Sequence, residues 1–257
     1  MKIYLINLAI RPDRLRFMKA QLDAQGLPFT RIDAINGLGD ENIGYPANHP
    51  RLSKGEYACY LSHVKCWEAF IASGDKHCLV LEDDIKLSKH FSKILTHAPF
   101  FSHRGAITRL ECRPFRTRVS KFWRYRFEGH KLRKITAFDG AAGALVLTRE
   151  YASYVLKHHK TPEIPVDDLL LDRGSTNYRP HRVYQLDPAP ATQMVFLQAA
   201  SIAGDGLSDL QKGRTPAPEK SLRPTGYGVL LSEIAQLGKN IWNNLFHTFK
   251  TIPFRED

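Results

Sequence analysis

The sequence lacks the features of a membrane-spanning or secreted chain. None of its apolar runs approaches the roughly 18 consecutive residues that a bilayer-spanning helix needs. The apolar run at residues 3–7 is too short for a signal peptide, and Arg11 and Asp13 interrupt it. Hydrophobic residues make up 43% and charged residues 25% of the 257 residues, which argues against disorder and allows a sizeable core. We therefore expect a cytoplasmic globular protein.

Cysteine is scarce, and acidic residues are outnumbered by basic ones. The four cysteines form no C-x-x-C pair and have no zinc-ligand spacing, so we expect buried, reduced thiols. Lysine and arginine total 37 against 26 acidic residues, which gives a formal net charge of +11. This excess favours association with a polyanion. The charge alone leaves open whether that is nucleic acid, an acidic membrane surface or a phosphorylated substrate.

Hydrophobic patterning predicts that the chain opens in the order β-α-β-α-β. Apolar runs at 3–7, 29–32 and 78–81 are typical of strands, and the segments between them repeat at helical spacing. Ser53 and Glu56 match a capping box at the start of the second helix. Later strands are expected at 144–147 and 182–186. The order predicts an α/β domain over residues 1–204, with an open, mixed and largely parallel sheet flanked by helices.

Residues 205–257 differ in composition from the rest. A Gly-, Pro- and Lys-rich stretch up to residue 226 reads as a linker, and the apolar and basic residues of 229–249 predict an amphipathic helical appendage. That helix has three alternatives: it lies on a membrane, it packs back onto the domain, or it forms a homodimer contact.

An acidic triplet, Glu82-Asp83-Asp84, follows directly after the expected strand at 78–81. Ligands of open α/β sheets bind at the carboxyl ends of strands. Carboxylates gathered there repel one another unless a cation neutralises them, and hard divalent ions prefer oxygen ligands. The alternative is a solvated turn in which Asp84 or Ser88 caps a helix. Two other function classes stay open: a nucleic-acid-binding protein that uses the basic, aromatic segment 113–134, and a metal-dependent phosphoesterase.

Six blocks, taken together, resemble glycosyltransferase family 25, which includes bacterial lipooligosaccharide galactosyltransferases and collagen-modifying relatives. The resemblance covers roughly residues 1–195, in order and at plausible spacing. The blocks are Ile6-Asn7-Leu8-x-x-Arg11-Pro12-Asp13-Arg14 with Phe29-x-Arg31-x-Asp33-Ala34, Ser53-x-Gly55-Glu56-x-x-Cys59-x-x-Ser62-His63-x-x-x-Trp67, Leu79-Val80-Leu81-Glu82-Asp83-Asp84-Ile85, Gly140-x-x-Gly143-Ala144-x-x-Leu147, Pro165-Val166-Asp167, and more loosely 188–193.

The resemblance implies a GT-A-like fold and an inverting transfer of a hexose, most often galactose from UDP-galactose, to a lipid-linked oligosaccharide acceptor. It implies a divalent metal, Mn²⁺ or Mg²⁺, on Glu82 and Asp84. We assign the polar residues of the matching blocks to donor binding: Asn7, Arg11, Arg14, Asp33, His63 and Asp83. The alternative for Arg11 and Arg14 is an exposed helix start, and for His63 a core position beside Trp67.

Inversion needs a base that deprotonates the acceptor hydroxyl. Asp167 and Asp168 are the candidates, with Asp167 at the position of the Pro-x-Asp block; the alternative for Asp168 is a helix cap. Glu56 is a further catalytic candidate, with the capping box as its alternative.

Acceptor contacts are expected from the basic, aromatic segment 113–134, with Arg113, Arg116 and Trp123 as candidates. Arginine suits phosphate groups, and aromatic rings suit sugar rings or a membrane surface. This predicts peripheral contact with the inner face of the membrane and no nucleic-acid partner. The alternative is a solvated loop.

Overall fold

The described part of the computed structural model comprises residues 1–40, 42–102, 106–137, 140–172, 174–200 and 245–257. Its centre is a nine-stranded sheet in the order β12-β7-β8-β10-β5-β9-β3-β1-β2. The strands are, in chain order, β1 (Lys2–Asn7), β2 (Thr30–Asp33), β3 (His77–Glu82), β5 (Ile107–Arg109), β7 (Arg116–Phe127), β8 (His130–Ile135), β9 (Ala144–Thr148), β10 (Val183–Asp187) and β12 (His247–Thr251).

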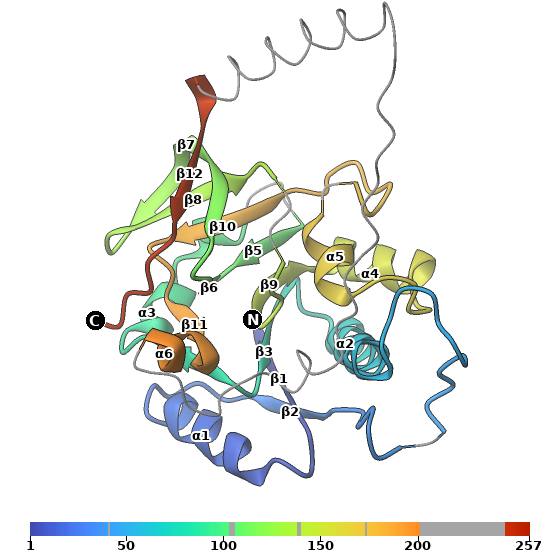
Figure 1. Ribbon diagram of the computed structural model, residues 1–257. Helices are drawn as coiled ribbons and strands as arrows, with labels where there is room; N and C mark the ends of the chain where they lie inside the picture. Colours follow the sequence, from blue (N-terminus) through green and yellow to red (C-terminus); the bar gives the residue numbers. More distant parts are fainter. Residues whose placement is uncertain (41, 103–105, 138–139, 173, 201–244) are drawn as a thin grey trace, which may run out of the picture.

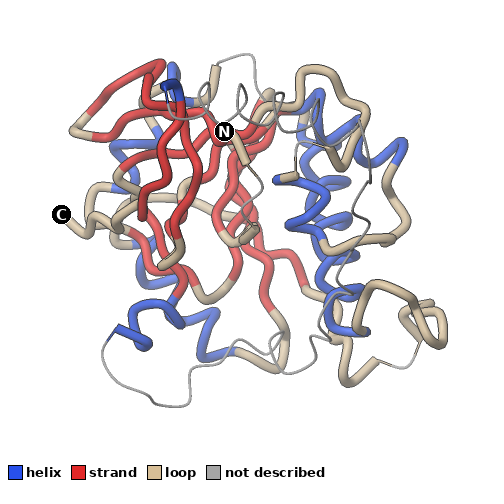
Figure 2. Tube along the Cα trace, turned by 45° about the horizontal axis from the view of Figure 1, so that its top comes forward, coloured by secondary structure: helices blue, strands red, loops and turns tan. Residues whose placement is uncertain are grey.

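Helices cover both faces of this sheet (Figures 1 and 2). On one face lie α2 (Lys54–Ser73), α4 (Arg149–His158) and α5 (Val166–Leu171); on the other lie α1 (Pro12–Asp23) and α3 (Phe91–Leu95). Central strands alternate between the two cores: in β3, Cys78 and Val80 face the α2 side, whereas Leu79 and Leu81 face the α1 side. Burial on both sides explains why this strand reads as a continuous apolar run.

A small second sheet lies beside the end of β3. It has the order β4-β11-β6 and consists of β4 (Ile85–Leu87), β6 (Glu111–Cys112) and β11 (Ala191–Gln193). A short helix, α6 (Met194–Ala200), follows β11, and a 3₁₀ turn at Ala98–Phe100 follows α3. This sheet matters for the site because it carries Glu111 and lies next to the acidic triplet.

The predicted class, a mixed sheet flanked by helices, is confirmed, as is the β-α-β-α-β opening. The capping box of α2 is also present, with Ser53 accepting from the Glu56 amide and the Glu56 carboxylate accepting from the Ser53 amide. The proportion of parallel pairing differs from the prediction. β1–β2, β1–β3 and β5–β10 are parallel, whereas five neighbouring pairs are antiparallel. The difference arises because residues 116–135 form a long hairpin and because β9 runs antiparallel to both of its neighbours. The hairpin also shows that most of the segment 113–134 is not a solvated loop.

The helix predicted over 229–249 is wrong at its carboxyl end. Residues His247–Thr251 form β12, which pairs antiparallel with β7; most of the predicted linker and helix lies outside the described residues. The alternation of Phe249 with polar neighbours suits a strand, and β7 supplies the backbone partners that local sequence cannot reveal. Among the described helices, none is long and apolar enough to cross a membrane.

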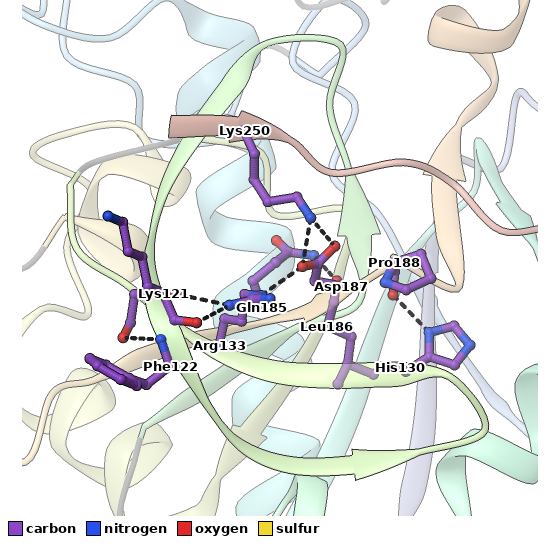
Figure 3. A network of polar contacts seen from close by, with 10 residues as sticks. Lys121, Phe122, His130, Arg133, Gln185, Leu186, Asp187, Pro188 and Lys250 are labelled. Carbon is purple, nitrogen blue, oxygen red and sulfur yellow. Dashed lines mark hydrogen bonds and ion pairs between the residues drawn. The ribbon is translucent and has the colours of Figure 1, made fainter. Parts of the chain in front are cut away.

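A buried ion-pair network attaches β12 to the sheet (Figure 3). Asp187, at the end of β10, accepts from Arg133 Nε at 2.7 Å and from Lys250 Nζ at 2.9 Å. Arg133 Nη1 also donates to the carbonyls of Ser120 and Lys121 at 3.1 and 2.6 Å. One carboxylate therefore joins β8, β10 and β12, and its arginine partner holds β7.

Candidate functional site

The candidate site lies at the sheet edge where several strands end. β1, β2, β3, β5 and β10 all point the same way, so their carboxyl ends share one edge. The register places Asn7 beside Asp33 and Ile6 beside Glu82. Because β9 is antiparallel, its amino end meets the same edge, and Glu82 N donates to Gly143 O at 2.8 Å. This geometry brings together blocks that lie far apart in the sequence.

Asn7 and Asp83 form the connection between β1 and the acidic turn. Asn7 Nδ2 donates to Asp83 Oδ2 at 2.7 Å, and Arg31 Nε donates to Asn7 Oδ1 at 3.0 Å. Arg14 Nη1 donates to the other oxygen of Asp83 at 3.1 Å. Asn7 and Asp83 are buried, so the structure shows them as positioning groups; direct contact with a donor stays a prediction.

Glu82 and Asp84 present the carboxylates of the predicted metal site. Burial raises the pKa of Glu82, with Asp83 and Asp167 adding to the rise. Burial also raises the pKa of Asp84, and the Glu82 charge contributes. Asp84 Oδ1 is buried without a hydrogen-bond partner, and Arg14 Nη1 lies 3.9 Å from Asp84 Oδ2. Two partly buried carboxylates, of which Glu82 disfavours the charge on Asp84 and Asp84 has an oxygen without a hydrogen-bond partner, fit a divalent cation.

Glu111 belongs to the same acidic crevice and was not anticipated from the sequence. It is fully buried on β6, where Oε1 accepts from the amides of Gly143 and Ala144 at 2.6 and 3.1 Å. Its Oε2 has no partner. Burial, followed by the Glu82 charge, raises the pKa of Glu111 to about 8. A Cβ at Gly143 would lie 3.1 Å from that oxygen, so the glycine of this block allows the close approach.

Asp167 lies in the first turn of α5 and points toward the loop before β9. Ala141 N donates to Asp167 Oδ2 at 3.4 Å, and Ala141 has a φ of 82°, a strained value for a residue with a Cβ. A Cβ at Gly140 would lie 2.7 Å from Asp167 Oδ2 and 3.3 Å from Arg113 Nη1. The charge of Asp167 adds to the rise in the pKa of Glu82 that burial causes, and it partly opposes the fall in the pKa of His63 that burial causes. The predicted base, one predicted acceptor arginine and the metal carboxylates therefore share one region.

Other predicted site residues lie at the margins of this region. Arg11 pairs with Asp13 at 2.8 Å at the start of α1, and Asp33 pairs with Arg31 at 2.9 Å at the end of β2. Glu56 Oε2 accepts from both the amide and the hydroxyl of Ser53 at 2.9 Å, in the capping box. The α5 helix begins after Pro165, so the capping alternative for Asp168 is wrong: Asp168 lies within the first turn. Catalytic roles for Glu56 and Asp168 stay predictions.

His63 lies on the face of α2 that meets the end of β3. It is 1% exposed, and its Nε2 lies 3.6 Å from Glu82 Oε1. Its ring is tilted against Trp67 at 5.9 Å between centroids. Burial lowers the pKa of His63 to about 4, so the imidazole is neutral at pH 7. The core position beside Trp67 is therefore present, and the side chain also faces a site carboxylate; contact with the donor stays a prediction.

The remaining predicted acceptor residues lie on the β7–β8 hairpin. Arg116 donates to Phe249 O at 3.0 Å, and Trp123 is 50% exposed. Lys131 Nζ lies 4.6 Å from the centre of the Trp123 ring. Seven residues of strand separate Arg116 from Trp123, or roughly 20 Å along β7 at about 3.3 Å per residue. Arg113 thus lies at the acidic crevice, while Trp123 lies far out on the hairpin.

Two buried polar residues support the base of the site and were also missed. Arg109, fully buried on β5, donates from Nε to Gln185 Oε1 at 2.6 Å and from Nη1 to Gly140 O at 2.8 Å. Gln185 Nε2 in turn donates to Glu111 O at 3.1 Å. A polar residue at one inward position of a short strand gives no recognisable motif, so the sequence carries no usable signal for them.

Comparisons with known proteins identify the family that this chain resembles. The family model for glycosyltransferase family 25 (LPS biosynthesis protein) matches residues 1–170. The lacto-N-neotetraose biosynthesis glycosyltransferase LgtE of Neisseria meningitidis serogroup B is 25% identical over 234 residues, which cover 83% of this chain and 82% of LgtE. A glycosyltransferase 25 family member of Aedes aegypti is 35% identical over 104 residues, and the human inactive glycosyltransferase 25 family member 3 is 35% identical over 103. Each of these two matches covers 35% of this chain and 17% of the relative's length.

Solved structures show a weaker likeness. An active-site mutant of LgtC superimposes with a TM-score of 0.40 at 13% identity and covers 98% of both chains. A glycosyltransferase involved in the glycosylation of the major capsid of PBCV-1 gives a TM-score of 0.42 at 10% identity, over 76% of this chain and 94% of that one. Because these TM-scores are low, the family assignment depends on the sequence match.

The acidic crevice predicts an unusual pH dependence of stability. The pKa of Glu111 is raised from 4.5 to about 8 in the folded protein, so its contribution is present below pH 4.5 and is lost as the pH rises through about 8. In EDTA, the free energy of unfolding should therefore fall between these pH values, and Glu111→Gln should reduce that fall by at least about 1 kcal/mol. Urea unfolding at a series of pH values measures it. The exposed Glu163→Gln is the control, and an identical fall in wild type and Glu111→Gln would contradict the assignment.

Proposed function

Since the chain belongs to glycosyltransferase family 25, we propose that it transfers a hexose from a nucleotide sugar to a glycan acceptor. Family membership alone does not decide activity, because one relative is named inactive. The observation that supports activity here is the partly buried acidic turn, in which the Glu82 charge helps to raise the pKa of Asp84 and Asp84 Oδ1 lacks a hydrogen-bond partner. Such an arrangement destabilises a purely structural turn, whereas a bound cation neutralises it.

Glu82 and Asp84 are the proposed ligands of a divalent cation, Mn²⁺ or Mg²⁺. Such a cation neutralises the charge that develops on a departing nucleoside diphosphate. Arg14, which contacts Asp83 and lies near Asp84, is placed to add a positive charge on the same side. Asn7 and Asp83 hold this arrangement together, and Arg11 and Asp33 lie at the outer ends of α1 and β2, where we propose further donor contacts.

Asp167 is the proposed catalytic base. Its carboxylate would accept the proton of the acceptor hydroxyl as that oxygen attacks the anomeric carbon opposite the leaving diphosphate, which inverts the configuration. The backbone amide of Ala141 fixes Oδ2, and the absence of a side chain at Gly140 leaves space beside it. Arg113, whose Nη1 lies on the same side of Gly140 as Asp167 Oδ2, is placed to bind an anionic or hydroxyl group of the acceptor.

The finer proposal is that the donor is UDP-galactose and the acceptor a lipid-linked lipooligosaccharide. The similarity to LgtE, named for lacto-N-neotetraose biosynthesis, supports a lipooligosaccharide glycan. The hairpin supports a lipid-linked, phosphorylated acceptor at the cytoplasmic face of a membrane. Phe122 and Trp123 are exposed there at 65% and 50%, between exposed basic residues of β7. Amphipathic aromatic rings flanked by basic groups suit a lipid–water interface.

The metal site is tested by UDP release from a panel of UDP-sugars, with Mn²⁺ or with EDTA. We expect metal-dependent hydrolysis of one donor, most readily UDP-galactose, and a loss of about 100-fold or more in Asp84→Asn. The exposed Asp23→Asn, on α1, is the matched control. If the folded wild-type protein neither hydrolyses nor binds any UDP-sugar, the transferase proposal is wrong.

The base is tested by Asp167→Asn. This variant should lose about 100-fold or more of kcat for transfer while its Kd for UDP with Mn²⁺ stays within about twofold, because the base acts only on the acceptor hydroxyl. Asp168→Asn, one residue further along the same turn, tests the second candidate and should retain transfer if Asp167 is the base. If Asp167→Asn retains substantial transfer, another carboxylate is the base.

The hairpin is tested by sedimentation with vesicles that contain phosphatidylglycerol. Trp123→Ala should weaken binding to the vesicles about fivefold, the loss expected for roughly 1 kcal/mol of aromatic and cation–π contact. The control Leu38→Ala removes another exposed apolar side chain, on the loop after β2. Equal binding of wild type and Trp123→Ala would place the membrane contact elsewhere.

A further inference from the structure

A second cluster of potential ligands consists of Cys59, His63 and Glu82, so it shares Glu82 with the proposed metal site. One ligand atom from each, a thiol sulfur, an imidazole nitrogen and a carboxylate oxygen, all lie within 4.8 Å of one another. Cys59 and His63 are four residues apart on α2, so both project from the same face of the helix. Glu82 reaches them from the end of β3. No motif spacing predicts this cluster, because its third member lies on another element.

His63 provides an independent sign of a missing ligand. Its side chain is 1% exposed, yet neither ring nitrogen has a hydrogen-bond partner, and the nearest charged atom to Nε2 is Glu82 Oε1 at 3.6 Å. A buried imidazole without a partner costs about 1–3 kcal/mol of stability. In native proteins such a group usually marks an unseen water or ion. Here the nitrogen faces an acidic group, so a cation is the complementary ligand.

The geometry suits a small tetrahedral ion. Bond lengths of about 2.3 Å to sulfur and about 2.0–2.1 Å to nitrogen and oxygen place the nitrogen and oxygen ligands of such an ion roughly 3.3–3.4 Å apart, and the sulfur about 3.5–3.6 Å from each. The 3.6 Å between His63 Nε2 and Glu82 Oε1 exceeds this by a few tenths of an ångström, which small side-chain rotations can close together with the approach of the Cys59 thiol. The surroundings are negative. Burial raises the pKa of the Cys59 thiol, and the charges of Glu82, Asp167 and Asp84 add to the rise.

We propose that Cys59, His63 and Glu82 bind a thiolate-preferring divalent cation of the Zn²⁺ class. A sulfur–nitrogen–oxygen set selects such an ion over Mg²⁺ or Mn²⁺, which prefer oxygen ligands. Binding replaces the thiol proton of Cys59, which passes to solvent, with a metal–sulfur bond. Glu82 belongs to both sets, so occupation of this site withdraws it from the cation that Asp84 binds. This competition for Glu82 rests on the proposed function, and it predicts that Zn²⁺ inhibits the Mn²⁺-dependent reaction.

The test is a titration of the metal-free full chain with Co²⁺, followed by absorption. Co²⁺ bound to a thiolate gives a sulfur-to-metal charge-transfer band in the near ultraviolet. We expect this band to saturate at one Co²⁺ per chain and to disappear when Zn²⁺ is added. It should be absent in Cys59→Ser and weakened about tenfold or more in affinity in His63→Gln. Absence of the band in wild type, or its persistence in Cys59→Ser, would overturn the proposal.

The controls separate this site from the catalytic one. Cys112→Ser removes another buried thiol, on β6, and should keep the band. Asp84→Asn should keep it too, although that variant is expected to lose UDP-sugar hydrolysis. Circular dichroism of each variant without metal checks folding, and Cys59→Ala replaces Cys59→Ser if the latter is unfolded. If the wild-type protein hydrolyses a UDP-sugar but shows no band, this site alone is rejected. If it shows the band but hydrolyses no UDP-sugar, only the proposed function is rejected.

Discussion

Buried Glu111 and the partly buried Glu82 and Asp84 lie together at the end of β3, and their mutual repulsion is the constraint around which the surrounding structure is arranged. Charged carboxylates buried together destabilise a fold unless each finds hydrogen bonds, a counter-charge or a proton. Glu111 takes two backbone amides, and Arg14 stands beside the acidic turn. Even so, one oxygen of Asp84 and one of Glu111 have no hydrogen-bond partner in the protein, which supports the proposal that a cation binds here.

The frame around this crevice is rigid for clear physical reasons. Parallel register fixes β1 against β3, and the Asn7–Asp83 hydrogen bond joins the two loops that follow them. Behind the crevice, Arg109 and Gln185 link β5, β10 and the Gly140 loop through buried hydrogen bonds. Such a fully satisfied polar network holds catalytic groups in place more firmly than apolar contacts do. Glu82 and Glu111 therefore lie on strands, and Asp84 lies in the two-residue turn that joins β3 to β4.

The sequence was informative where function lies next to regular structure. The acidic triplet could be placed because it ends an unbroken apolar strand, and the capping box located α2. Glu111 and Arg109 could not be foreseen, because each is an isolated polar residue on a very short strand whose partners are 30 or more positions away. The cluster of Cys59, His63 and Glu82 was hidden because Glu82 lies on β3, whereas the other two residues lie on α2. The C-terminal strand was misread because an apolar and basic segment fits either a helix or an edge strand until its partner is known.

The return of the chain to the sheet through β12 has a consequence for shortened forms of the protein. A chain that stops near residue 204 would keep every residue of the acidic crevice. It would also lose the strand that pairs with β7 along five residues, together with Lys250, one of the two cations that neutralise buried Asp187. The freed edge of β7 carries exposed aromatic side chains, and an unpaired edge of that kind recruits strands from other molecules. Truncation near residue 204 would thus leave the acidic residues in place but make the protein prone to aggregate.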